Sequence, residues 1–268
     1  MAGILNIQFP PKAGDKEANL NKVKEFVSGY CDKPLDLIVI PEFFSTAIDD
    51  KSMINEPEDE NGGIVTEFLK DLAVRYNTNI ICGSVMEKSG DKLFNTCFVL
   101  DRHGEIAGKY RKIHLFNYFG GNEGTYTTAG DKPLVAALDF ARVGVSLCFD
   151  IKFPMLYREL IKRGAEIIVS PSAWSIPKSA PDKEKEIFTN TWKAMNICRA
   201  TESLVYFVTS NLTGRTNPFL ESVGNSMITG PMGEVISNPG TEETAEYAEL
   251  DLSVIYDLKH KVPVAMME

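Results

Sequence analysis

Residues 143–150 read VGVSLCFD, and this stretch joins a strand-like pattern to a reactive side chain. Its valines and Leu147 alternate with small or polar residues, which is typical of a strand packed against a core. A helical pattern follows over residues 153–162. Cys148 therefore lies where a predicted strand leads into a predicted helix. A free cysteine at this place is either a small buried hydrophobic residue or a nucleophile.

Strand-like and helix-like segments alternate on both sides of this stretch. Short apolar runs such as LIVI predict strands, and apolar residues repeated every three or four positions predict helices. The other predicted strands are 3–9, 36–40, 79–88, 92–100, 104–112, 165–174, 204–211 and 223–237, the last a pair, and the other predicted helices are 15–30, 64–76 and 183–202. The strand 36–40 runs into a loop at Pro41 and Glu42. Strands that are apolar on both faces need helices outside the sheet, so we expect one α/β domain over residues 1–268.

Composition argues against several classes of partner. The chain has 268 residues, and 28 Lys and Arg against 37 Asp and Glu give a net charge of −9. No basic block is present, so a nucleic-acid partner is not expected. The N-terminus lacks the pattern of a signal peptide, and every apolar run is far shorter than the ~20 residues that span a bilayer, so no membrane partner is expected either.

Cysteine and histidine usage argues against disulfides, metals and cofactors. The five cysteines are widely spaced and form no C-x-x-C motif, which favours a reducing, cytoplasmic setting. The three histidines form no pair at the spacing of metal ligands, so we expect no metal. No glycine-rich phosphate or dinucleotide loop follows a predicted strand, so no cofactor is expected.

Three reactive side chains lie at the ends of apolar segments. Glu42 follows the run LIVIP, Lys112 lies in KYRKIHLF, and Cys148 ends VGVSLC. In open α/β sheets, ligands bind beyond the carboxyl ends of strands, where Glu42 and Cys148 are both expected. A carboxylate can take a thiol proton, and an ammonium group can stabilise an oxyanion. The alternatives are a solvated glutamate, a surface lysine and a structural thiol.

The same segments resemble a known family. PEFF around Glu42, KYRKIHLF around Lys112 and GVSLCFDIKFP around Cys148 are similar to the Glu, Lys and Cys motifs of the nitrilase superfamily of carbon–nitrogen hydrolases, and they occur in the same order. NEGTYTTAGD, GAEIIVSPSAW, RATESLVYFVTSNLTG and GNSMITGPMGEVI are similar to later segments of the family. The resemblance covers the chain from Ile4 to Leu252.

This resemblance implies a four-layer α-β-β-α sandwich, an α/β fold with two sheets between helical layers. It implies a homodimer or higher homo-oligomer without a cofactor, acting on a small-molecule amide or nitrile. Glu42, Lys112 and Cys148 would be the general base, the cation that stabilises the oxyanion, and the nucleophile.

The function that the resemblance favours is cysteine-dependent hydrolysis of non-peptide carbon–nitrogen bonds. We expect an amidase acting on a small linear amide or carbamoyl compound through a thioester. The alternatives are a true nitrilase that forms a thioimidate, an acyl transferase, and a catalytically silent relative that serves as a binding or scaffold protein.

A second glutamate is expected beside the trio. Glu123 is placed by counting back from Tyr126 and Gly130, because the loop after Lys112 departs in length from the family pattern. It would orient Lys112 or bind the polar end of the substrate. The alternative is a solvated loop residue.

Aromatic residues are expected to line the substrate pocket, or else to belong to the ordinary core. They are Phe149, Trp174 and Tyr118. The loop 117–125 is expected to form part of the pocket mouth, since its adjacent glycines, Gly120 and Gly121, permit unusual backbone angles. Its apolar Tyr118 and Phe119 need a packing partner, either over the pocket or at a subunit contact.

Overall fold

Alternating side chains along the first strand show how the layers are built. In β1 (Ala2–Gln8), Ile4 packs in one apolar cluster while Leu5 and Ile7 pack in another. Successive side chains of a strand point to opposite faces, so β1 is buried from both sides. A sheet buried in this way needs a covering layer on each face.

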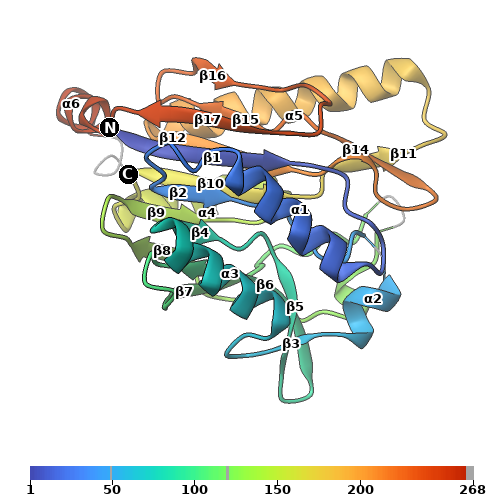
Figure 1. Ribbon diagram of the computed structural model, residues 1–268. Helices are drawn as coiled ribbons and strands as arrows, with labels where there is room; N and C mark the ends of the chain where they lie inside the picture. The colour runs from blue at the N-terminus through green and yellow to red at the C-terminus, as the bar shows by residue number, and fades with distance from the viewer. Residues whose placement is uncertain (49, 119–120, 264–268) are drawn as a thin grey trace.

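The computed structural model describes residues 1–48, 50–118 and 121–263 (Figure 1). Within these residues the larger sheet has eight strands in the order β17-β1-β2-β4-β6-β5-β3, with β7 paired to β6. Besides β1, its strands are β2 (Leu37–Val39), β3 (Glu58–Asp59), β4 (Asn79–Ile81), β5 (Val85–Ser89), β6 (Lys92–Leu100), β7 (Ile106–Arg111) and β17 (Thr244–Leu250).

The second sheet has six strands in the described part of the chain, in the order β16-β15-β12-β10-β9-β8. They are β8 (Leu134–Ala137), β9 (Arg142–Val145), β10 (Ile167–Ser172), β12 (Tyr206–Asn211), β15 (Met227–Thr229) and β16 (Val235–Ser237). A small third sheet joins β11 (Ser175–Pro177), β14 (Leu220–Val223) and β13 (Thr213–Arg215).

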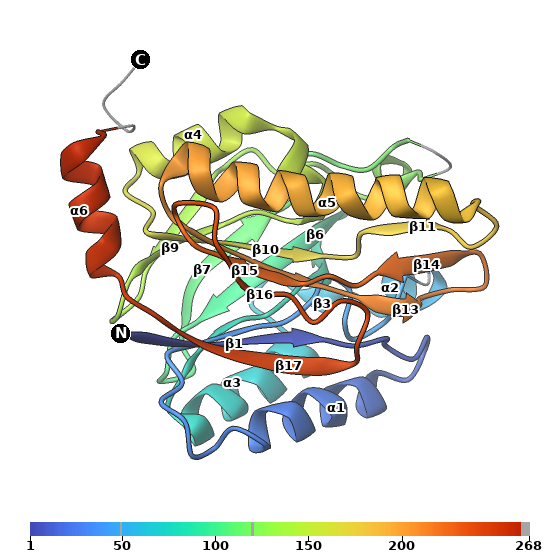
Figure 2. The ribbon, with the colours of Figure 1, turned by 90° about the horizontal axis from the view of Figure 1, so that it is seen from above.

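Helices cover the outer faces of the two large sheets. The α-helices are α1 (Lys16–Ser28), α2 (Asp50–Asn55), α3 (Ile64–Tyr76), α4 (Pro154–Lys162), α5 (Asp182–Ser203) and α6 (Ser253–Lys261), and two 3₁₀ turns are η1 (Glu123–Thr125) and η2 (Cys148–Lys152). Helices α1 and α3 lie outside the larger sheet, and α4 and α5 lie outside the second (Figure 2). The predicted α-β-β-α sandwich is confirmed.

One predicted strand was wrong, and several strands were missed. The single strand expected over 79–88 is interrupted between β4 and β5, where Gly83 has a φ of +56°. A Cβ at Gly83 would lie 2.1 Å from the Pro41 carbonyl oxygen, so the break lets the chain before Glu42 approach closely. Strands β8, β13, β14 and β17 were not predicted, since their patterns of apolar residues are weak.

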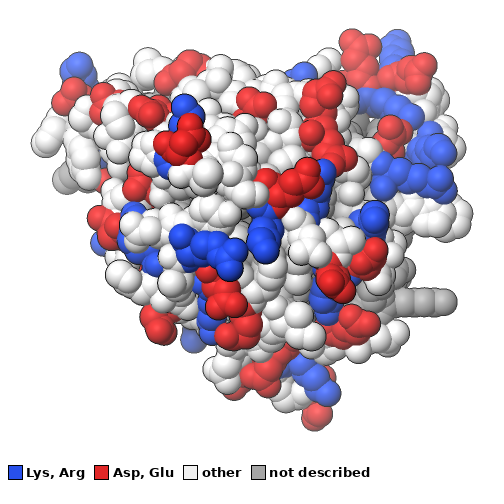
Figure 3. All heavy atoms as spheres, in the orientation of Figure 1, with Lys and Arg blue, Asp and Glu red and all other residues white. Residues whose placement is uncertain are grey.

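Charge and hydropathy along the surface fit the composition. On the face drawn in Figure 3, basic side chains lie beside acidic ones rather than in a block of their own. None of the helices that the structure describes is long and apolar enough to cross a bilayer.

Candidate active site

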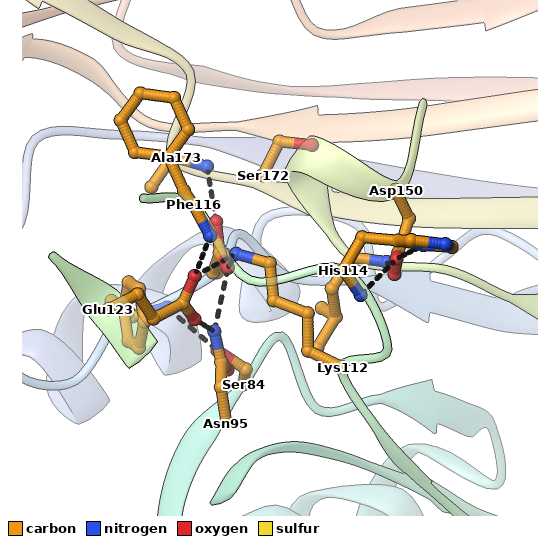
Figure 4. A network of polar contacts seen from close by, with 12 residues as sticks. Ser84, Asn95, Lys112, His114, Phe116, Glu123, Asp150, Ser172 and Ala173 are labelled. Carbon is orange, nitrogen blue, oxygen red and sulfur yellow. Dashed lines mark hydrogen bonds and ion pairs between the residues drawn. The ribbon is translucent and has the colours of Figure 1, made fainter. Parts of the chain in front are cut away.

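Glu42 is buried just beyond the carboxyl end of β2. Its side chain is 1% exposed, and both carboxylate oxygens accept hydrogen bonds. Oε1 accepts hydrogen bonds from Lys112 Nζ at 2.9 Å and from Asn95 Nδ2 at 2.9 Å. Oε2 accepts one from the backbone N–H of Ala173 at 3.0 Å, just past the end of β10 (Figure 4). A residue of the larger sheet thus contacts the end of a strand in the second sheet.

Lys112 follows β7 directly, and the pairing of β7 with β6 fixes where it points. Its backbone N–H donates to the Asn95 carbonyl at 2.9 Å. Lys109 and Arg111 point to the other face, where both bind Glu87. The Lys112 side chain is 3% exposed, against 30% for Lys109 and 29% for Arg111. The alternative of a surface lysine is therefore wrong for Lys112.

Glu123 holds the other side of the same ammonium group. Its Oε2 accepts from Lys112 Nζ at 3.0 Å and from the Phe116 backbone N–H at 2.8 Å. Its Oε1 accepts from Asn95 Nδ2 at 2.9 Å, so one amide donates to both glutamates. Figure 4 shows Lys112 extended toward Glu123 and Asn95. Glu123 is 5% exposed, which rules out the solvated loop residue.

Cys148 is the first residue of η2, and only residues 146 and 147 separate it from the end of β9. Its φ is +44°, in the left-handed region that side chains other than glycine rarely adopt, and it is 8% exposed. Sharp turns of this kind recur at functional sites, where the surrounding structure maintains the strain.

The three groups affect each other's protonation. Burial raises the pKa of the Cys148 thiol, the charge of Glu42 raises it further, and the charge of Lys112 acts against both. The Ala173 backbone N–H also lowers the pKa of this thiol. Cys148 therefore lies within electrostatic reach of Glu42 and Lys112, and its surroundings favour the protonated thiol.

The carboxylates keep the lysine charged. Burial alone would lower the pKa of Lys112, but Glu123 and Glu42 together raise it well above its ordinary value. Burial raises the pKa of Glu42; Lys112 opposes this rise and Glu123 adds to it. The site thus holds a permanent ammonium group, a carboxyl group suited to proton transfer and a thiol that needs a base.

Comparisons with known proteins show the family of the chain. Residues 6–260 match the carbon–nitrogen hydrolase family. The chain belongs to that family. It is 30% identical over 258 residues to the 2-oxoglutaramate amidase of Bacillus subtilis, covering 96% of this chain and 94% of that protein. It is 29% identical to the chloroplastic omega-amidase of Arabidopsis thaliana, covering 93% of this chain and 68% of that protein.

Solved structures of carbon–nitrogen hydrolases share this fold. A carbon–nitrogen hydrolase from Helicobacter pylori superposes with a TM-score of 0.88 at 21% identity, covering all of this chain and 95% of that one. The predicted superfamily and a hydrolase of the amidase type are confirmed. The roles of individual residues in this carbon–nitrogen hydrolase stay predictions.

The predicted aromatic residues lie in different surroundings. Phe149 is 8% exposed, and its ring centroid is 5.6 Å from that of Tyr118, which is 57% exposed. Trp174 is 6% exposed and stacks on Phe188 and Trp192, each at 5.3 Å. Its indole Nε1 is buried and has no hydrogen-bond partner within the described residues. The predicted contribution of Phe119 and Gly120 lies outside the described residues.

Sequence reasoning missed several residues of this site. Asn95 gave a weak signal, because it is an amide inside the apolar strand pattern KLFNTCFVL. Its orientation follows from its neighbours, since two carboxylates can only accept hydrogen bonds and so face Nδ2. The Ala173 backbone N–H gave no signal, because a backbone group has no residue type. Asp150 and His114 lie in the quoted motifs GVSLCFDIKFP and KYRKIHLF, but neither of them was assigned a role from the sequence.

No metal-binding group is apparent in the ranges described. Among those residues, no three His, Cys, Asp or Glu side chains are placed so that they could hold a metal ion. The position between the two glutamates is occupied by the Lys112 ammonium group instead.

Lys112→Ala tests the predicted role of the buried ammonium. We expect the rate of amide hydrolysis to fall by roughly 10²–10³, the usual effect of removing a group that stabilises an oxyanion. Lys109→Ala is the matched control, because it removes the same charge from the opposite face of β7. Steady-state kinetics measure both variants. Equal rates for Lys112→Ala and wild type would show that the ammonium is structural only.

The pH dependence of kcat/KM tests Glu42 as the base. Because burial raises the pKa of Glu42, activity should be lost, as pH falls, at a pH above the ordinary glutamate value of about 4.3. The Glu123 charge contributes to that rise, so Glu123→Gln should move the acid limb to lower pH in whatever activity remains. The profile should be measured with an uncharged amide. An acid limb that does not respond to Glu123→Gln would assign it to another group.

Proposed function

We propose that this protein is an amidase that hydrolyses the terminal amide of a small linear substrate whose other end carries a carboxylate. The observation that carries the proposal is the buried Glu42–Lys112–Glu123 cluster within electrostatic reach of Cys148. The relatives named 2-oxoglutaramate amidase and omega-amidase support this class of substrate.

The first half of the reaction transfers the acyl group to the enzyme. Glu42 takes the thiol proton while Cys148 Sγ attacks the carbonyl carbon. The carbonyl electrons move to oxygen, and the Lys112 ammonium stabilises the resulting oxyanion in a site that contains little water. The backbone N–H at the start of η2 can add a second donor, because the first amides of a helical turn have no partner within the turn. When the carbon–nitrogen bond breaks, Glu42 returns the proton to the departing nitrogen, and a thioester remains on Cys148.

The second half releases the acid. Water attacks the thioester carbonyl while Glu42 removes one of its protons, and the same ammonium group stabilises the second oxyanion. Cleavage of the carbon–sulfur bond gives the carboxylic acid and restores the thiol with the proton held by Glu42. Glu123 takes no part in these transfers. Its role is to keep Lys112 charged and oriented, as its two hydrogen bonds to Lys112 and Phe116 suggest.

A cation for the distal carboxylate lies close to this site. Lys152 is exposed and ends η2, the turn that begins with Cys148. Its Nζ lies 5.5 Å from the centre of the Trp174 ring, and Trp174 directly follows Ala173, whose N–H binds Glu42. The same aromatic wall, with Phe149 and Tyr118 beside the nucleophile, would hold the short carbon chain.

The alternatives differ in the substrate that they consume and in whether an acyl-enzyme forms. A nitrilase would release ammonia from a nitrile, and a carbamoylase would release it from a ureido acid. An acyl transferase would need an amine, and a silent relative would form no acyl-enzyme. No contact of the described residues favours any of these over the amidase. The homodimer and the cytoplasmic setting expected from the sequence stay predictions.

An ammonia-release screen tests the proposed function. We expect release from ω-amides that carry a carboxylate, such as 2-oxoglutaramate and succinamate, and much less from butyramide, a neutral amide of matched length. Mass spectrometry should find the acyl group on Cys148, and Cys148→Ala should abolish both signals while leaving the melting temperature nearly unchanged. Release from nitriles or ureido acids alone, or no acyl-enzyme at all, would refute the amidase.

Lys152→Met tests how the carboxylate is recognised. Loss of a charge-assisted hydrogen bond at an exposed position should raise KM for succinamate by about tenfold and leave butyramide unaffected. Lys24→Met on α1, in the opposite helical layer, makes the same change of charge as a control. An equal effect on both amides would mean that Lys152 does not contact the carboxylate.

A further inference from the structure

Asp150 is a buried carboxylate that the reaction scheme leaves unused. It is fully buried, two residues after the nucleophile, and it accepts four hydrogen bonds. Oδ1 accepts from the His114 backbone N–H at 3.0 Å and from His114 Nδ1 at 2.7 Å. Oδ2 accepts from the Leu147 backbone N–H at 2.9 Å and from the Tyr110 hydroxyl at 2.6 Å. Figure 4 shows Asp150 and His114 facing each other beside Lys112.

On one side Asp150 fixes the nucleophile turn. Its carboxylate binds the N–H of Leu147, and its own backbone N–H donates to the Leu147 carbonyl at 3.0 Å. These two bonds close a loop around Cys148, the residue with the positive φ. A left-handed conformation persists in a residue with a Cβ only when its surroundings hold it there. Asp150 supplies that restraint.

On the other side Asp150 fixes the segment that follows Lys112. His114 is held through both its backbone N–H and its ring, and the ring lies flat on Phe153 with centroids 3.6 Å apart. Because an ionised carboxylate can only accept, Nδ1 carries the proton in this pair. Two residues further on, the Phe116 N–H binds Glu123. The short segment from Lys112 to Phe116 therefore places both partners of the oxyanion-stabilising cluster.

We propose that Asp150 and His114 are positioning residues that set the placement of the Lys112 ammonium relative to Cys148 Sγ. One carboxylate restrains both the turn that carries the thiol and the segment after Lys112. The turn follows a strand of the second sheet, and the segment follows a strand of the larger sheet. The proposal rests on the proposed function for the roles of Lys112 and Cys148. It goes beyond that function because neither residue touches the reacting atoms.

The rate of alkylation of Cys148 by iodoacetamide tests the proposal without any substrate. The charge of Lys112 lowers the pKa of the thiol, so an ammonium group that moves away should slow alkylation. His114→Phe keeps an aromatic ring but removes the Nδ1 donor. We expect slower alkylation, measured by mass spectrometry of the Cys148 peptide, and a fall in kcat of about 10² with little change in KM.

Two matched variants separate positioning from general stability. Tyr157→Phe removes a buried hydroxyl that binds Ser146 beside the same turn and makes no bond to Asp150, so it should leave alkylation and kcat close to wild type. His114→Asn restores a short donor without the ring and should recover much of the loss. Equal losses in His114→Phe and Tyr157→Phe, or no recovery in His114→Asn, would overturn the proposal.

The Lys112→Ala background gives the decisive measurement. If His114 acts through Lys112, His114→Phe should add no further loss of alkylation rate when the ammonium is already absent. Losses of the same factor in both backgrounds would contradict this. If circular dichroism shows that His114→Phe does not fold, Asp150→Asn carries the same pair of measurements, with the same expectations.

The two proposals fail in different ways. A wild-type protein that turns over no amide would refute the proposed function, and the alkylation rates would still decide whether Asp150 and His114 position the ammonium. An active wild type with unchanged alkylation and kcat in His114→Phe would refute the positioning proposal alone.

Discussion

The structure depends on one buried ammonium group held between two buried carboxylates. Removing a charge from water is costly unless a partner of opposite sign and further hydrogen bonds replace the lost solvation. Lys112 meets this requirement because Glu42 and Glu123 both lie within 3.0 Å of Nζ. Asn95 donates to Oε1 of each glutamate, and the Ala173 backbone N–H donates to the second oxygen of Glu42. A displaced partner would leave an uncompensated charge in the interior, so the cluster restrains the strand ends that carry it.

Two carboxylates around one ammonium group leave one negative charge uncompensated, and this charge is available for proton transfer. Glu123 is bound by Lys112, Asn95 and the Phe116 N–H, so its charge is compensated where it lies. Glu42 has a raised pKa and faces a thiol whose pKa is raised as well. A proton can pass from the thiol to this carboxylate, whose affinity for a proton burial has raised, while the lysine stays charged throughout. The surroundings of the two glutamates therefore differ, which suits Glu42 to proton transfer and Glu123 to holding Lys112 in place.

The sandwich itself sets the distance between the two halves of the site. Glu42 and Lys112 follow strands of the larger sheet, whereas Cys148 and Ala173 follow strands of the second sheet. The apolar core between the sheets includes Ile4, Val145 and Val169, and close packing of such side chains resists sliding. Polar contacts fix the register as well, since Ser210 Oγ donates to the Ile7 carbonyl across the sheets at 2.6 Å.

The sequence by itself determined the alternation of strands and helices and the family, and it predicted Glu42, Lys112 and Cys148 as site residues, because apolar periodicity and short motifs are local properties of the chain. Glu123 could be placed only by counting, and its burial depends on a hydrogen bond from Phe116 that no pattern of residue types reveals. Tertiary structure alone decided the remainder. Asn95, the Ala173 N–H and the Asp150–His114 pair join segments up to 131 residues apart, and contacts across such separations leave no periodic trace in the sequence. They exist because two twisted sheets pack face to face and bring the carboxyl ends of distant strands to one place.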